Sequence, residues 1–293
     1  SEAIDLTIRC LIQPGDEVLI VEPSFVCYRP IVSLCGGVPV VIETKEENEF
    51  RLTADELREK ITDKTKLLVL PYPNNPTGAI MRREDLEAIA KVLKDTNIMI
   101  ASDEIYSELT YSGKHCSIAE IEGMRERTIV INGFSKSFAM TGWRLGFLGG
   151  PKEIVSQMLK LHQYAIMSSP TVSQYAAIVA MHSCQKDIDP MRNEYNIRRR
   201  FVVDSFNKLG LKCFAPQGAF YVFPCIKSTG MTSTDFCEKL VYTKKVAVVP
   251  GDAFGECGEG YVRVSYAYSL NHLREAIKRI GEFLEDIKNG NVQ

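Results

Sequence analysis

Short apolar runs alternate with amphipathic segments along the first half of the chain. Two helices are predicted between the runs, one over residues 82–95 and one over 53–61. The second begins with a capping-box pair, Thr53 and Glu56. Runs that are apolar throughout are typical of strands buried on both faces, and here they occupy residues 17–21, 38–43, 66–72, 97–104, 128–132 and 144–149. Their alternation with helices predicts an α/β domain with a mostly parallel sheet.

After Pro151 the pattern changes to that of helices. A proline in the first turn favours helices at 151–164 and 170–183, and a long charged helix is predicted at about 188–210. The rest of the chain mixes short apolar strands in "GAFYVFP", "VAVVPG" and "YVRVSYA" with helices near 233–245 and 270–289. We therefore expect two domains, a large one over residues 1–189 and a small one over residues 190–293.

The first residues have the pattern of an amphipathic helix. "SEAIDLTIRCLI" carries apolar residues at helical spacing and begins without a methionine. The segment therefore resembles a helix that is cut near its N-terminus, and it predicts that the chain is a fragment or a processed product.

Composition and charge narrow the class of partner. The 293 residues carry a net charge of -2 without a basic stripe, which argues against a nucleic-acid or membrane surface and favours small ligands. No apolar run is long enough to span a bilayer. The nine cysteines form no C-x-x-C pair and no zinc-type cluster, so we expect buried, reduced thiols in a cytoplasmic protein and no metal site.

Polar segments follow three consecutive predicted strands. "NNPTG" (74–78), "SDEIY" (102–106) and "GFSKS" (133–137) each begin where an apolar run ends. The carboxyl ends of parallel strands meet at one edge of a sheet, where ligands collect. Taken singly, an Asn-Pro turn, a helix-capping Asp or a solvated Lys would be ordinary. Together, the segments bring five candidate site residues to one edge: Asn75, Asp103, Tyr106, Ser135 and Lys136.

This set of side chains suits pyridoxal 5'-phosphate (PLP). That cofactor needs a lysine amine, an acid at its ring nitrogen, and donors to its phenolic oxygen and phosphate. The motifs "PYPNNPTG", "SDEIYSELTY", "SKSFAMTGWRLGF", "GAFYVFP" and "GYVRVSYA" resemble those of class I/II aminotransferases over essentially the whole chain. Within that family the chain is most similar to the PatA-like, aspartate/aromatic branch. The resemblance implies PLP fold type I, with a three-layer large domain, a mostly parallel mixed sheet and a smaller α+β C-terminal domain.

The resemblance also implies roles around the cofactor ring. Lys136 matches the lysine that forms a Schiff base and later acts as the base that moves the substrate's proton. Asp103 matches the acid beside the ring nitrogen. Tyr106 and Asn75 match the pair that binds the phenolic oxygen, and Phe25 matches the aromatic residue stacked on the ring.

Other positions match the phosphate and substrate sites. Arg144, Ser135 and the backbone at Ser1 match the phosphate-binding set, with Ser1 at a helix N-terminus. Arg263 matches the arginine that binds the substrate α-carboxylate, and the resemblance also implies a substrate-binding role for Asn75.

Two departures from the family pattern stand out. Many relatives have a serine three residues before the lysine, where this chain has Gly133. The family also has a segment before the position of Ser1, which we expect to be absent here together with its share of the small domain.

The resemblance implies a PLP-dependent aminotransferase. It would move an amino group between an amino acid (aspartate, an aromatic acid or an N-acyl-diaminopimelate) and a 2-oxo acid such as 2-oxoglutarate, by a ping-pong route in a homodimer. One alternative is a PLP-dependent C–S β-lyase of the same fold. The other is a non-catalytic aminotransferase-like module, against which the full set of site residues argues.

Overall fold

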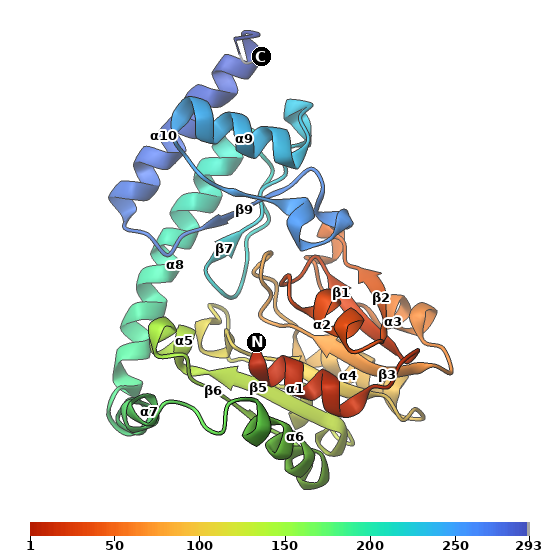
Figure 1. Cartoon of the computed structure of the whole chain (residues 1–293). Helices are drawn as coiled ribbons and strands as arrows, with labels where there is room; N and C mark the ends of the chain where they lie inside the picture. Colours follow the sequence, from red (N-terminus) through yellow and green to blue (C-terminus); the bar gives the residue numbers. More distant parts are fainter. Residues whose placement is uncertain (292–293) are drawn as a thin grey trace.

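A six-stranded sheet is the centre of the computed structural model, which describes residues 1–291 (Figure 1). Its strand order is β2-β1-β3-β4-β5-β6, with β1–β5 parallel and β6 antiparallel to β5. The strands are β1 (Glu17–Glu22), β2 (Val38–Glu43), β3 (Thr65–Leu70), β4 (Met99–Asp103), β5 (Thr128–Gly133) and β6 (Gly146–Gly149). The mostly parallel sheet predicted from the apolar runs is confirmed.

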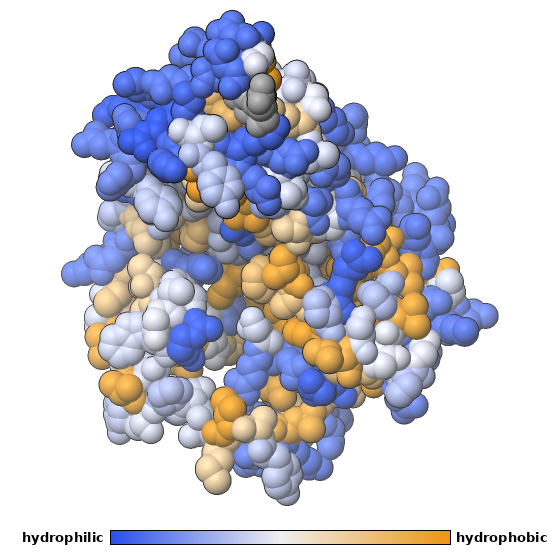
Figure 2. Space-filling model, turned by 45° about the horizontal axis from the view of Figure 1, so that its top comes forward, coloured by the Kyte–Doolittle hydropathy of each residue, from blue (hydrophilic) through white to orange (hydrophobic). Residues whose placement is uncertain are grey.

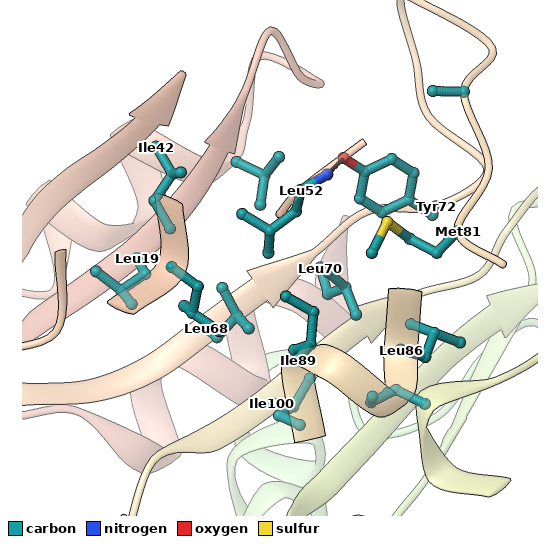
Figure 3. Close-up of a cluster of buried hydrophobic side chains, with 14 of the residues drawn as sticks. Leu19, Ile42, Leu52, Leu68, Leu70, Tyr72, Met81, Leu86, Ile89 and Ile100 are labelled. Atoms are coloured by element: carbon teal, nitrogen blue, oxygen red, sulfur yellow. Dashed lines mark hydrogen bonds between the residues drawn. The ribbon is translucent and has the colours of Figure 1, made fainter. Parts of the chain in front are cut away.

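Two layers of helices cover the sheet. Successive residues of each strand point to opposite faces, so Leu68 packs on one side and Leu67 on the other. The first face is covered by α3 (Ala54–Lys60) and α4 (Arg83–Leu93), the second by α1 (Glu2–Leu11), α2 (Tyr28–Leu34) and α6 (Lys152–Ala165). Figure 3 shows the first face, where leucine and isoleucine side chains of β1, β2, β3 and β4 meet those of α4. This is the three-layer arrangement that the sequence predicted.

Local sequence signals explain several of these elements. Both hydrogen bonds of the predicted capping box form at the start of α3, between Thr53 and Glu56. The four apolar residues that recur along α4 are all buried. Two helices were not predicted: α2, and the single turn α5 (Phe134–Ser137) directly after β5. The α2 segment has no side-chain cap and is only seven residues long, so its pattern gives little helical signal.

The strand β6 differs from the prediction. It begins at Gly146 rather than at residue 144, and three of its four residues are exposed. Among the described residues β6 is an edge strand with a single strand neighbour, so it lacks the burial that its apolar sequence suggests.

The C-terminal part forms a second, smaller core. A three-stranded antiparallel sheet contains β7 (Tyr221–Val222), β9 (Val262–Ser265) and β8 (Val249–Pro250) in that order. It packs with α8 (Gln185–Lys208), α9 (Ser233–Lys244) and α10 (Leu270–Lys288). In Figure 1, α8 runs from beside α7 (Thr171–Ser183) to α9 and α10, so one helix belongs to both parts. We keep the domain division at residue 190, inside α8, as a proposal.

Two smaller expectations concern cysteines and membranes. All nine cysteines are free, but only Cys213 and Cys237 are buried, so the expectation of uniformly buried thiols was wrong. The other seven are half-buried. Within residues 1–291, no helix combines the length and apolar character that crossing a membrane requires.

Candidate active site

A cavity of about 900 Å³ lies at the carboxyl edge of the large sheet, beneath the small β-sheet. Loops after β3, β4 and β5 supply one wall, α1 supplies another, and β7 and β9 supply the roof. The structure brings every predicted site residue to this cavity: Ser1, Phe25, Asn75, Asp103, Tyr106, Ser135, Lys136, Arg144 and Arg263.

Lys136 lies in the short helix α5, three residues after the end of β5. Its amine is 5.7 Å from the ring centroid of Tyr106 and 5.4 Å from that of Phe220. Burial lowers the pKa of Lys136, and the nearby cations Arg144 and Arg263 lower it further. The amine is therefore easier to deprotonate than that of an ordinary surface lysine.

Asp103 is the last residue of β4, and its carboxylate is buried. Tyr28 donates a hydrogen bond of 2.8 Å to one carboxylate oxygen, and the Ile105 amide donates one of 3.3 Å to the other. Burial raises the pKa of Asp103, while these two hydrogen bonds oppose the rise. A cationic partner inside the cavity would stabilise the ionised carboxylate. The sequence did not identify Tyr28 as a site residue.

Tyr106 is buried near Asp103, on the loop that follows β4. Its hydroxyl lies 3.0 Å from that of Tyr221, which comes from β7. Burial raises the pKa of Tyr106 well above its ordinary value. The phenol therefore keeps its proton over the physiological range and remains available as a donor.

Arg263 projects from β9 between two aromatic rings. The guanidinium carbon is 4.6 Å from the ring centroid of Tyr221 and 4.7 Å from that of Phe254. One terminal nitrogen donates a 2.9 Å hydrogen bond to the side-chain oxygen of Asn75. The Nε atom is buried and has no acceptor among the described residues. A buried guanidinium N–H without a partner is costly, so this geometry indicates a place for an anionic ligand.

The cavity lining also includes a helix N-terminus and a second arginine. Ser1 precedes the first turn of α1, and its side chain makes no capping hydrogen bond. Arg144 has a left-handed backbone (φ 51°) and donates 2.8 Å to the Thr141 carbonyl. The Thr141 hydroxyl in turn donates to the Ser135 carbonyl. A helix N-terminus beside an exposed guanidinium suits a phosphate group.

Gly133 has a packing explanation. A Cβ atom at this position would lie 2.9 Å from the Cα of Gly146 and 3.1 Å from the Leu145 carbonyl oxygen. The pairing of β5 with β6 thus leaves no room for the serine that many relatives carry there. Any phosphate contact at this end has to come from neighbouring side chains or backbone amides.

The residues present fit PLP on the chemistry of their donors. A buried carboxylate lies where a protonated ring nitrogen would be stabilised, and a protonated phenol lies near a lysine with a lowered pKa. The phosphate-type and carboxylate-type sites contain different arginines. A parallel sheet with these groups at its carboxyl edge defines the PLP-dependent class of fold type I.

Comparison with known proteins identifies the family. A sequence model described as "Aminotransferase class I and II" matches residues 1–280. The chain belongs to this family, whose members use pyridoxal phosphate, and it is an aminotransferase. This membership favours amino transfer over the two alternatives, a C–S β-lyase and a non-catalytic module.

Three relatives illustrate the similarity. An aspartate aminotransferase of Pyrococcus abyssi is 47% identical over 98% of this chain and 75% of its own length. A probable N-acetyl-LL-diaminopimelate aminotransferase of Bacillus subtilis is 47% identical over 97% and 72%. The crystal structure of an aromatic aminotransferase from Pyrococcus horikoshii OT3 superimposes with a TM-score of 0.95, at 46% identity over 98% and 77%. The chain thus spans about three-quarters of the length of these proteins.

Proposed function

We propose that the cavity performs amino transfer by a ping-pong route, with Lys136 as the residue that carries PLP. Asp103 pairs with the ring nitrogen, and Tyr106 with Asn75 binds the phenolic oxygen. The proposal rests above all on one observation: a lysine of lowered pKa lines the same cavity as a buried acid and a guanidinium whose buried Nε–H has no acceptor among the described residues.

The remaining roles follow from position. Phe25, partly buried at the cavity wall, is placed to cover the face of the ring. Arg144, Ser135 and the backbone at Ser1 bind the phosphate. Arg263 binds the substrate α-carboxylate through its planar fork, which the aromatic rings on both sides keep oriented.

When bound, PLP supplies an electron-withdrawing ring that stabilises negative charge on the carbon next to the substrate amino group. The chain's own residues orient the substrate and move its proton. Arg263 fixes the substrate carboxylate, so the C–H bond on the neighbouring carbon is held in one orientation. Lys136 takes this proton on Nζ and returns it one position away, because burial and two nearby cations lower its pKa and so favour the unprotonated amine.

For the substrates, we propose an amino donor of the aspartate, aromatic or N-acyl-diaminopimelate type, with 2-oxoglutarate as an acceptor. The printed names of the relatives support this range. Arg263 and Asn75 would bind the carboxylate that all of these donors share.

Transfer of labelled nitrogen tests the function directly. The protein is loaded with PLP and given ¹⁵N-labelled amino acids of the three types, together with 2-oxoglutarate. We expect ¹⁵N in glutamate with wild-type protein and at least a hundredfold less with Lys136→Ala. Lys160→Ala, a change of an exposed lysine on α6, is the matched control and should transfer normally. Release of ¹⁵N as ammonia with pyruvate from cystathionine, without transfer, would instead identify a C–S β-lyase.

We further propose that the native protein is a cytoplasmic homodimer. Large apolar side chains are exposed along α6, α7 and the connection between them, most strongly Tyr164 at 91% and Met167 at 81%. In Figure 2 apolar residues gather on the lower half of the face shown, whereas the upper part is mostly hydrophilic. The connection between α6 and α7 also lines the cavity through Ser169 and Pro170. A second copy seated on this face would cover the apolar side chains and border the active site.

Sedimentation of the PLP-loaded protein tests the dimer. We expect a species of twice the chain mass, and Tyr175→Glu on the exposed face of α7 should shift it to the monomer and weaken PLP binding. Tyr242→Glu, on the equally exposed surface of α9, is the control and should leave the dimer intact. A fully active wild-type monomer would contradict the proposal.

A further inference from the structure

Tyr221 lies between two residues of the proposed site without having a role in it so far. It is the first residue of β7, it is 7% exposed, and it lines the cavity. Its hydroxyl is 3.0 Å from the Tyr106 hydroxyl, and its ring centroid is 4.6 Å from the guanidinium carbon of Arg263. One side chain of the small sheet therefore contacts both the phenol near the cofactor ring and the arginine for the substrate.

The backbone before Tyr221 is held firmly. Ala219 has a left-handed conformation (φ 57°), which is unfavourable for a residue with a side chain. Its carbonyl accepts hydrogen bonds from the hydroxyls of Tyr111 and Tyr266, and Ala219 is fully buried. Tyr221 itself is paired with Ser265 of β9, two residues beyond Arg263. These contacts fix Tyr221 relative to both of its neighbours in the site.

We propose that Tyr221 is a positioning residue for amino transfer. Its hydroxyl donates a hydrogen bond to the Tyr106 oxygen, so that the Tyr106 proton is directed to the phenolic oxygen of PLP. Its ring contacts the Arg263 guanidinium and keeps the planar group oriented toward the substrate carboxylate. This inference rests on the proposed function, and it adds a link between the cofactor and substrate subsites.

Two physical effects support the assignment. Hydrogen bonds in a chain polarise one another, so a phenol that accepts one becomes a stronger donor of the next. The face of an aromatic ring attracts a cation, and contact with two rings restricts the orientations open to the planar fork. Tyr221 belongs to the C-terminal part of the chain and Tyr106 to the loop after β4 of the large sheet, so the hydrogen bond also joins the two parts at the site.

Tyr221→Phe removes the hydroxyl and keeps the ring. The absorbance of bound PLP, titrated with pH, reports how strongly the phenolic oxygen is stabilised as an anion. We expect the pKa of this chromophore to rise by roughly 0.4–1 unit, the effect of one neutral hydrogen bond. kcat should fall several-fold while KM for the amino acid changes less than about twofold. Tyr221→Leu, which also removes the ring, should raise KM about tenfold in addition.

A double-mutant cycle separates this role from general loosening of the site. Tyr106→Phe should raise the chromophore pKa more than Tyr221→Phe does, and adding Tyr221→Phe to it should change nothing further. Tyr242→Phe, which removes an exposed hydroxyl on α9, should leave the pKa at the wild-type value.

The outcomes distinguish the two proposals. If Tyr221→Phe leaves the chromophore pKa unchanged, or shifts it equally in the Tyr106→Phe background, the role of Tyr221 is refuted while amino transfer stands. If wild-type protein fails to transfer ¹⁵N, the proposed function itself fails. If Tyr221→Phe does not fold, the chromophore pKa of the Tyr106→Phe variant decides. A chromophore pKa equal to that of wild type in this variant would also refute the hydrogen-bond chain.

Discussion

Replacing Arg263 by lysine tests how the substrate carboxylate is bound. Lysine keeps the positive charge but loses the planar fork, and its single ammonium replaces two parallel N–H groups. Losing one charge-assisted hydrogen bond costs about 1.5–3 kcal/mol. Weaker contact with the rings of Tyr221 and Phe254 adds about 1 kcal/mol in all. The total of about 2.5–4 kcal/mol predicts a decrease in kcat/KM of roughly 100-fold to 1,000-fold.

The loss should appear mainly as weaker substrate binding, since the carboxylate is held both before and during the reaction. The assay compares single-turnover half-reactions of wild type and Arg263→Lys with an amino acid and with the corresponding amine, which lacks the carboxylate. The amine should react equally slowly with both proteins. Arg274→Lys, an exposed arginine 6.0 Å from the ring of Phe201, is the matched control and should behave as wild type. An equal loss for the amine, or an unchanged KM for the amino acid, would refute the reasoning.

Three further predictions concern the rest of the site. Tyr28→Phe should lower the free energy of unfolding of the PLP-free protein by about 1–3 kcal/mol at pH 7, because the buried Asp103 carboxylate loses one of its two donors. This loss should shrink as pH falls and Asp103 becomes protonated, and a pH-independent loss in urea titrations would argue against it. Lys136→Met should raise the melting temperature of the PLP-free protein at pH 7, since a folded-state pKa below 10.5 means that the charged amine destabilises the fold there. The gain should decrease as pH rises toward 10.5, and a constant gain would point to apolar packing alone. Gly133→Ser should destabilise the protein by about 1–3 kcal/mol through its clash with β6, whereas Gly142→Ser, with no atom within 4 Å of its Cβ, should be nearly neutral in the same unfolding assay.

The central sheet and half of the site could be predicted because they depend on short-range patterns. Apolar runs fix which segments become strands, and parallel pairing then brings the ends of β3, β4 and β5 together with Asp103 and Lys136. The antiparallel pairing and the exposure of β6 were not predictable from its apolar residues, because exposure depends on which elements pack next to the strand. The missed helix α2 carries Tyr28, so the hydrogen bond to Asp103 was missed with it.

Contacts between distant segments carried no local signal. The Tyr106–Tyr221 hydrogen bond joins residues 115 positions apart, and the Arg263–Asn75 bond joins residues 188 apart. Tyr221 stands in "GAFYVFP", where alternating aromatic residues are equally typical of a buried strand. Only the position of β7 and β9 over the cavity shows that Tyr221 belongs to the site and not merely to the core.

The most direct test of the central claim is to locate the cofactor on the chain. The PLP-loaded protein is reduced with borohydride and digested, and its peptides are mapped by mass spectrometry. The account predicts one pyridoxyl group, on Lys136, in the peptide that contains "GFSKSFAMTGWR". A pyridoxyl group on another lysine, with Lys136 unmodified, would contradict it.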